Sequence, residues 1–340
     1  MVTEEQVRES LQGILVPGVK RSLTDMNLVR DIALDEGKVG VTLASSALNE
    51  GAQDWLRSKV KDAVGGLNGG TTTEVTFIDV KATEVNEIGS VIAVMSGKGG
   101  VGKSLVASLT AVALKRQGYR VGILDADITG PSIPKMLGVR ERPVGSNTGI
   151  MPVISRSGIE MISFNLILEQ EEDAVIWRGP LISKAITQFW EEVVWGKLDY
   201  LVVDLPPGTA DAPLTVMQTL PVSGVIIVST PQDLTNMIVK KAVSMARKMD
   251  KPILGVVENM SFLYVPEIDK KIELFGRSRG DEMAQAAGAP LLGTLPIDPE
   301  LARLCDEGNI ERYSSDAFAS MTANLAGALK MPDAGNSGGR

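Results

Sequence analysis

The chain has 340 residues, of which 44% are hydrophobic, and a formal net charge of −8 with a pI near 4.9. This length predicts about two domains with a sizeable core, and the acidic balance argues against a nucleic-acid partner. The sequence has no histidine and one cysteine, Cys305, which excludes histidine acid–base catalysis, histidine-ligated zinc and a disulfide within one chain.

No apolar run reaches the ~18 residues of a membrane span, and the acidic start of the chain, residues 1–5, differs from a signal peptide. We therefore expect a cytoplasmic protein with no membrane partner. Without histidine, its chemistry must use carboxylates, lysines, backbone dipoles and a bound metal.

Residues 1–80 predict a small α+β domain, and the polar residues 81–89 predict a linker after it. The expected elements of the small domain are a helix over 4–15, strands over 28–34 and 39–44, a helix over 51–64 and a strand over 74–80.

From residue 90 to residue 330, apolar strands alternate with helices, which predicts an α/β domain with a doubly wound, mostly parallel sheet. The expected strands cover residues 91–95, 121–124, 200–203, 224–228, 253–257 and 291–295. Polar residues and glycines follow their carboxyl ends, where sheets of this kind bind ligands. Residues 331–340 are rich in small and polar residues, and we expect them to be disordered.

The most informative segment covers residues 96–104. It reads S-G-K-G-G-V-G-K-S and fits the P-loop pattern G-x-x-x-x-G-K-S, with a strand before it and a helix after it. Lys103 would reach the β- and γ-phosphates of ATP, and the Ser104 hydroxyl would bind Mg²⁺. The expected nucleotide-binding residues of this loop are Gly97, Lys98, Gly99, Gly100, Val101, Gly102, Lys103 and Ser104.

The same loop has a second interpretation. Gly97, Gly99 and Gly102 spell the G-x-G-x-x-G fingerprint of dinucleotide-binding folds. That fingerprint explains neither the Lys103-Ser104 pair nor the aspartate that ends a later strand, Asp204. We therefore favour the P-loop.

Three aspartates at strand ends complete the expected catalytic site. Asp125 and Asp127 follow the strand over 121–124, and Asp204 follows the strand over 200–203. Asp204 would bind Mg²⁺ through water, as in a Walker B site, and Asp125 would belong to the Mg²⁺ shell. Asp127 would position or activate the attacking water. The alternative role for one of the first two is to cap the next helix.

Two further residues are candidates for contacts with nucleotide. Lys98 would reach across a dimer interface to neutralise charge in the partner's phosphoryl transfer, or else is a surface lysine. Asn259, after the strand over 253–257, would bind the adenine edge, or else is a turn or cap residue. Pro231, Gln232 and Pro296 would frame the base.

Two other features leave their roles open. Arg178, in the segment Trp177-Arg178-Gly179-Pro180, would serve a switch or a dimer face, or is a plain loop arginine. Cys305 lies in an expected helix over 301–306, and a lone cysteine is more often a small buried hydrophobe than a metal ligand.

Five segments together resemble the Mrp/ApbC family of deviant-Walker P-loop ATPases, the iron–sulfur cluster carrier proteins. They read S-G-K-G-G-V-G-K-S (96–104), D-A-D-I-T-G-P-S (125–132), W-R-G-P (177–180), D-L-P-P-G-T (204–209) and V-E-N-M-S (257–261). The resemblance covers roughly residues 90–330. Residues 1–80 resemble the small iron–sulfur assembly domain that often precedes this ATPase, on the basis of the order of elements and of residues 26–31.

The resemblance implies a slow, Mg²⁺-dependent ATPase that acts as a homodimer. It further implies that the dimer holds an iron–sulfur cluster between its subunits and delivers it to apo iron–sulfur proteins or assembly factors. By the family pattern, residues 97–104 bind phosphates, Asp127 and Asp204 serve hydrolysis and Mg²⁺ binding, and Lys98 acts across the dimer.

The sequence departs from the family pattern at its cysteines. Many members carry Cys-x-x-Cys just after the Asn-Met-Ser segment, and here residues 261–269 contain no cysteine, nor do residues 44–49 of the small domain. A [4Fe–4S] cluster usually needs four thiolates, and two chains offer only two. A nucleotide-gated scaffold that carries no cluster is therefore the main alternative. A membrane-positioning ATPase of the cell-division type shares the P-loop but lacks an amphipathic tail here.

Overall fold

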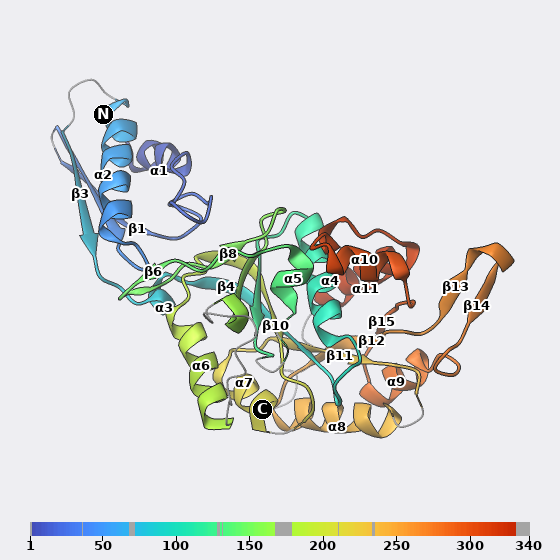
Figure 1. Cartoon of the computed structure of the whole chain (residues 1–340). Helices are drawn as coiled ribbons and strands as arrows, with labels where there is room; N and C mark the ends of the chain where they lie inside the picture. Colours follow the sequence, from blue (N-terminus) through green and yellow to red (C-terminus); the bar gives the residue numbers. More distant parts are fainter. Residues whose placement is uncertain are drawn as a thin grey trace.

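The computed structural model of the chain describes residues 2–35, 37–67, 72–127, 130, 132–166, 179–209, 211–232 and 235–330. It contains a three-stranded sheet built from the first 78 residues and an eight-stranded sheet built from the rest, which form separate units in Figure 1. In the described residues, no helix is both long and apolar enough to cross a membrane.

The N-terminal unit packs two helices on its sheet. The strands are β1 (Val29–Asp35), β2 (Lys38–Ala44) and β3 (Thr72–Ile78), in that order, with β1 and β2 antiparallel and β2 and β3 parallel. The helices are α1 (Glu4–Gln12) and α2 (Glu50–Gly65). Both begin at residues with a capping side chain, since Thr3 accepts from the Gln6 amide and Asn49 accepts from the Ala52 amide. The small α+β domain expected from the sequence is present.

The segment predicted as a linker, residues 81–89, is ordered structure. It forms the short helix α3 (Ala82–Val85) and the first residues of β4 (Glu87–Met95). Glu87 and Ile88 pair in parallel with Lys197 and Leu198, so the central strand is longer than its apolar run. The expected tail, 331–340, lies outside the described residues.

The second sheet is the doubly wound, mostly parallel sheet predicted from the sequence. Its strand order is β15-β12-β11-β4-β10-β5-β9-β8, and only β8 and β9 pair antiparallel. Besides β4, its strands are β5 (Val121–Asp125), β8 (Val153–Ile154), β9 (Glu160–Ser163), β10 (Lys197–Asp204), β11 (Gly224–Ser229), β12 (Ile253–Glu258) and β15 (Leu291–Thr294).

Helices cover both faces of this sheet (Figure 1). One face carries α4 (Lys103–Arg116), α5 (Ile133–Leu137), α10 (Pro299–Asp306) and α11 (Asp316–Lys330), and the other carries α6 (Gly179–Glu192), α7 (Asp211–Thr219), α8 (Thr235–Lys248) and α9 (Gly280–Ala287). Residues 91–95 of β4 are all apolar because both faces of the strand are buried. Ile92 and Val94 pack in the core under α4, while Val91, Ala93 and Met95 pack in the core under α8.

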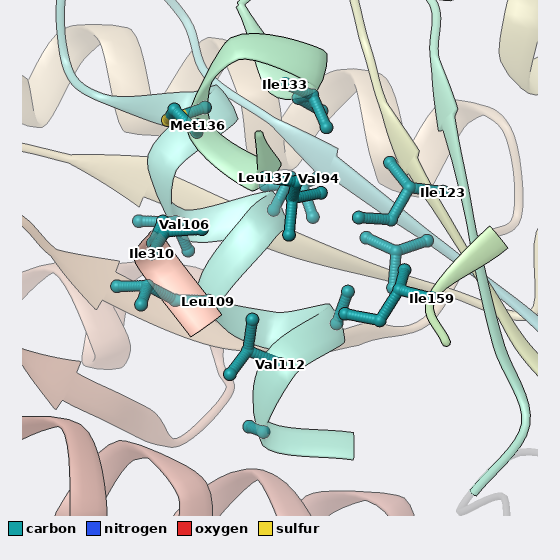
Figure 2. Packing of buried hydrophobic residues seen from close by; sticks show 14 of the residues in the cluster. Val94, Val106, Leu109, Val112, Ile123, Ile133, Met136, Leu137, Ile159 and Ile310 are labelled. Atoms are coloured by element: carbon teal, nitrogen blue, oxygen red, sulfur yellow. The ribbon is translucent and has the colours of Figure 1, made fainter. Parts of the chain in front are cut away.

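Helix α4 is buried along almost its whole length. Val106, Leu109 and Val112 belong to the same core cluster as Val94 of β4 and Ile123 of β5 (Figure 2). The first residue of this helix is Lys103, so packing of α4 against the sheet fixes where the end of the predicted P-loop lies.

Several elements are absent from the sequence prediction. They are β8, β9, the helices α6, α9 and α11, and two small hairpins, β6–β7 (Gly145–Ser146, Gly149–Ile150) and β13–β14 (Leu263–Val265, Lys270–Ile272). The β13–β14 hairpin projects from the body of the molecule in Figure 1.

Arg21 joins the N-terminal unit to the large sheet. Its guanidinium group forms an ion pair with Glu160 at the start of β9, and it donates to the carbonyls of Trp195 (2.9 Å) and Lys197 (2.7 Å). It also donates to the carbonyl of Asp25 in its own unit, at 2.8 Å. Burial raises the pKa of the Glu160 carboxyl to about 7, while Arg21 acts in the opposite direction.

The backbones of the two units approach closely beside this contact. Gly196 has φ +61°, and a Cβ atom there would lie 2.6 Å from Cα of Met26. Only glycine fits such an approach. The N-terminal unit is therefore in contact with the amino end of β10, at the end of the sheet remote from the P-loop.

Candidate functional site

The candidate site lies where the carboxyl ends of β4, β5, β10 and β12 meet. The P-loop connects β4 to α4, and its backbone is held from two sides. The Ser96 hydroxyl donates to the Lys98 carbonyl at 2.8 Å, and the Gly208 amide, from the loop after β10, donates to the Ser96 carbonyl at 3.0 Å. The amino end of α4 adds a helix dipole that favours an anion at this position.

Lys103 is the centre of the polar contacts in the site. Its ammonium group lies 2.6 Å from Asp204 Oδ1 and 3.2 Å from Asp127 Oδ2. The Ser104 hydroxyl donates to Asp204 Oδ2 at 2.5 Å. The structure thus brings together four residues that the sequence predicted for phosphate, metal and water chemistry.

The parallel register explains this convergence. Asp204 is the last residue of β10 and pairs with Asp125, the last residue of β5, and with Val94 of β4. Three strands that end at the same edge therefore present their next residues to one space.

The carboxylates are almost completely buried, with exposed fractions of 1% for Asp125, 8% for Asp127 and 0% for Asp204. Burial raises the pKa of the Asp125 carboxyl to about 8, and the nearby Asp204 carboxylate acts in the same direction. Burial also raises the pKa of Asp204, against the stabilising charge and hydrogen bond of Lys103. A cation bound beside these carboxylates would favour their charged forms.

Asp125 is held by two hydrogen bonds. It accepts from the Ser163 hydroxyl at 3.0 Å and from the backbone amide of Asp127 at 3.3 Å. Ser163 is a site residue that the sequence prediction missed. It ends β9, a short strand with no clear apolar run, and only the register of β5 with β9 puts it opposite Asp125.

Asn259 lies against the P-loop. Its side chain is 1% exposed, and its Nδ2 donates to the Val101 carbonyl at 3.0 Å. The sequence predicted a contact with the adenine edge for this residue, and the described contact is with the loop itself.

Lys98 extends from the P-loop to the loop after β11. Its ammonium group donates to Gln232 Oε1 at 2.5 Å within the same chain. The sequence predicted that Lys98 acts across a dimer, and this role stays a prediction. Residues 177–178 and the side chains of residues 179–183 lie outside the description, as do residues 128, 129 and 131 of the loop after β5.

The residues present fit a Mg²⁺ ion. Mg²⁺ prefers oxygen ligands and usually keeps several waters, with one or two protein ligands beside substrate phosphates. Ser104 Oγ and the Asp204 carboxylate supply such oxygens side by side, with Asp125 on the adjacent strand.

The family model described as "NUBPL iron-transfer P-loop NTPase" matches residues 87–330, and a model of iron–sulfur cluster assembly proteins matches residues 4–77. The chain belongs to the NUBPL iron-transfer P-loop NTPase family. This membership excludes the dinucleotide interpretation of Gly97, Gly99 and Gly102.

Relatives of this NTPase match either nearly the whole chain or about 70% of it. An iron–sulfur cluster carrier protein of Aquifex aeolicus is 39% identical over 335 residues, which are 90% of each chain. A carrier protein of Clostridium perfringens is 46% identical over 242 residues, or 69% of this chain and 85% of the relative. A solved nucleotide-binding protein from Archaeoglobus fulgidus, in complex with ADP, is 44% identical with a TM-score of 0.62. It covers 70% of this chain and 94% of its own.

Proposed function

We propose that the chain binds and hydrolyses ATP with Mg²⁺ as a homodimer and delivers iron–sulfur clusters to apoproteins. The observation that carries this proposal is the convergence of Lys103, Ser104, Asp127 and Asp204 beside the P-loop. Membership of an iron-transfer NTPase family and the ADP complex of a relative at 44% identity support it.

Each residue has a defined task in this proposal. The backbone amides of residues 97–104 bind phosphate oxygens, and Lys103 binds the β- and γ-phosphates. Asp127 orients the attacking water, at a position 3.2 Å from the Lys103 ammonium. Ser104 and Asp204, with Asp125 on the adjacent strand, would hold Mg²⁺, and the ion would neutralise charge on the phosphates.

The ammonium group of Lys103 must move for ATP to bind. It forms ion pairs with Asp204 and Asp127, where it compensates their charge. Bound ATP with Mg²⁺ would supply an anion for Lys103 and a cation for Asp204, so both of these buried charges would keep a partner.

The proposed role of Lys98 requires a homodimer. In one chain its ammonium donates to Gln232, and in the proposed dimer it binds the phosphates of the partner's ATP. We place the dimer in the cytoplasm, in line with its acidic composition.

The cysteine content favours one second candidate, a nucleotide-gated scaffold that carries no cluster. Cys305 lies in α10 and is partly buried, and burial together with Asp306 raises the pKa of its thiol to about 11. A thiol with a raised pKa is a poor metal ligand, because the ligand is the thiolate.

Anaerobic reconstitution with iron and sulfide separates the two candidates. The carrier is expected to bind about four iron and four sulfide ions per two chains. The matched variant Cys305→Ser reports the ligands: loss of the cluster assigns them to Cys305 of both copies, and retention assigns them to other groups. If neither protein binds iron, while ATP is still hydrolysed, the scaffold is correct.

A further inference from the structure

Asn259 combines a buried hydrogen bond with a tight fit to the P-loop. Its Nδ2 donates to the carbonyl of Val101 at 3.0 Å. Val101 lies between two glycines with left-handed backbone conformations, Gly100 at φ +79° and Gly102 at φ +81°. In a P-loop the amides must face the phosphates, so the carbonyls need partners on the opposite side.

The side chain of Asn259 also occupies the space that Gly102 leaves open. A Cβ atom at residue 102 would lie 2.1 Å from Asn259 Nδ2. The glycine is therefore required for two reasons, its positive φ and the presence of this amide.

The backbone around Asn259 is itself firmly held. Its amide donates to the Ser229 carbonyl of β11 at 2.8 Å, and the next residue, Met260, has a left-handed φ of +55°. The buried Glu258 carboxylate accepts from the Ser278 hydroxyl at 2.6 Å and from the Arg279 amide at 2.7 Å. Asn259 thus links the carboxyl ends of β11 and β12 to the P-loop by hydrogen bonds.

We infer that Asn259 is a positioning residue, which holds the P-loop in its phosphate-binding conformation through the Val101 carbonyl. The inference rests on the proposed nucleotide-binding function and assigns a role within that site. It differs from reading of the adenine edge, in which the amide selects the base and leaves phosphate binding unaffected.

The two roles predict different ligand dependence. ATP carries an amino group on its base, ITP carries a carbonyl there, and inorganic tripolyphosphate has no base. A positioning residue affects all three ligands, because all three bind through phosphates. A base-reading residue leaves the binding of tripolyphosphate unchanged, because this ligand has no base.

Calorimetric titration of the full chain with each ligand, in the presence of Mg²⁺, tests the inference. Asn259→Ala and the isosteric Asn259→Asp both remove the donor to Val101. We expect each to bind ATP, ITP and tripolyphosphate about tenfold more weakly, with an unchanged ATP-to-ITP ratio. Asn259→Asp keeps an acceptor for the adenine amino group, so a base-reading role predicts near wild-type affinity for all three ligands in this variant.

A second measurement uses the tight fit at Gly102. Gly102→Ala in the Asn259→Ala background is expected to cost less affinity than in the wild type, because the clash at 2.1 Å is gone. The matched control is Gly118→Ala. Gly118 has φ +91° with open space around it, so its substitution by alanine adds backbone strain alone. The effect of Gly118→Ala on ligand affinity should therefore be the same in the wild type and in the Asn259→Ala background.

Selective loss of ATP binding, or unchanged binding of all three ligands by both Asn259 variants, would overturn the inference. Equal costs of Gly102→Ala in the two backgrounds would also contradict it. A wild-type protein that binds none of the ligands would overturn the proposed function as well, and this outcome is visible before any variant is made.

Discussion

The ammonium group of Lys103 forms ion pairs with two buried carboxylates, Asp204 at 2.6 Å and Asp127 at 3.2 Å. Lys103 thus balances carboxylates that have almost no contact with solvent. In the proposed function it also binds the phosphates of ATP.

Lys103→Ala is expected to abolish ATP binding and to destabilise the nucleotide-free protein by about 3 kcal/mol, because it leaves a buried carboxylate unpaired. Titration with ATP and urea unfolding measure the two effects. The control is Lys135→Ala, whose exposed pair with Asp306 should change stability by less than about 0.5 kcal/mol. An alanine variant of Lys103 as stable as the wild type would show that another group balances Asp204.

Substitution of Asp127 is predicted to slow ATP hydrolysis and to leave ATP binding intact. Asp127→Asn is expected to bind ATP with near wild-type affinity and to hydrolyse it at least about a hundredfold more slowly, since the group that orients water is lost. Single-turnover hydrolysis measures this separately from product release. The exposed Asp62→Asn is the matched control, and equal rates in the wild type and Asp127→Asn would remove Asp127 from the mechanism.

At the scale of elements, helix α4 determines where the P-loop ends. Leu109 is fully buried in the core between α4 and the sheet (Figure 2). Leu109→Ala is expected to lower the free energy of unfolding by about 2–5 kcal/mol through lost burial and a cavity. Denaturant unfolding tests this, with Leu274→Ala, at an exposed leucine, as the control. Losses of similar size in both variants would contradict the packing described for α4.

The elements that could be predicted from the sequence are those with uninterrupted apolar runs, such as β5, β11 and β12. Strand β9 could not, because polar Glu160 and Ser163 stand at its ends and only its neighbours determine that it pairs. The same limit applies to the site. The P-loop is local in sequence and was recognisable, whereas the contacts of Ser163 and Asn259 depend on residues 38 and 158 positions away.

At the scale of the molecule, Arg21 connects the N-terminal unit to the amino end of the large sheet. Arg21→Ala removes the ion-pair partner of the buried Glu160 and one donor from each of the backbone carbonyls. We expect a loss of about 3–5 kcal/mol and separate melting of the two units in calorimetry.

Arg8→Ala is the control for that experiment. Arg8 belongs to the same unit and pairs with Glu4, but both side chains are about half exposed, so its loss should change stability by at most about 0.5 kcal/mol. A single unchanged melting transition in Arg21→Ala would show that the units are held together by their apolar contacts alone.

In the proposed function, ATP controls the delivery of an iron–sulfur cluster. The most direct test loads the full chain with iron and sulfide anaerobically and follows cluster transfer to an apo-ferredoxin by the recovery of its visible absorbance. We predict that Mg²⁺ and ATP change the transfer rate of the wild type and leave that of Lys103→Ala unchanged. Transfer that is identical in the two proteins, with and without ATP, would contradict the account.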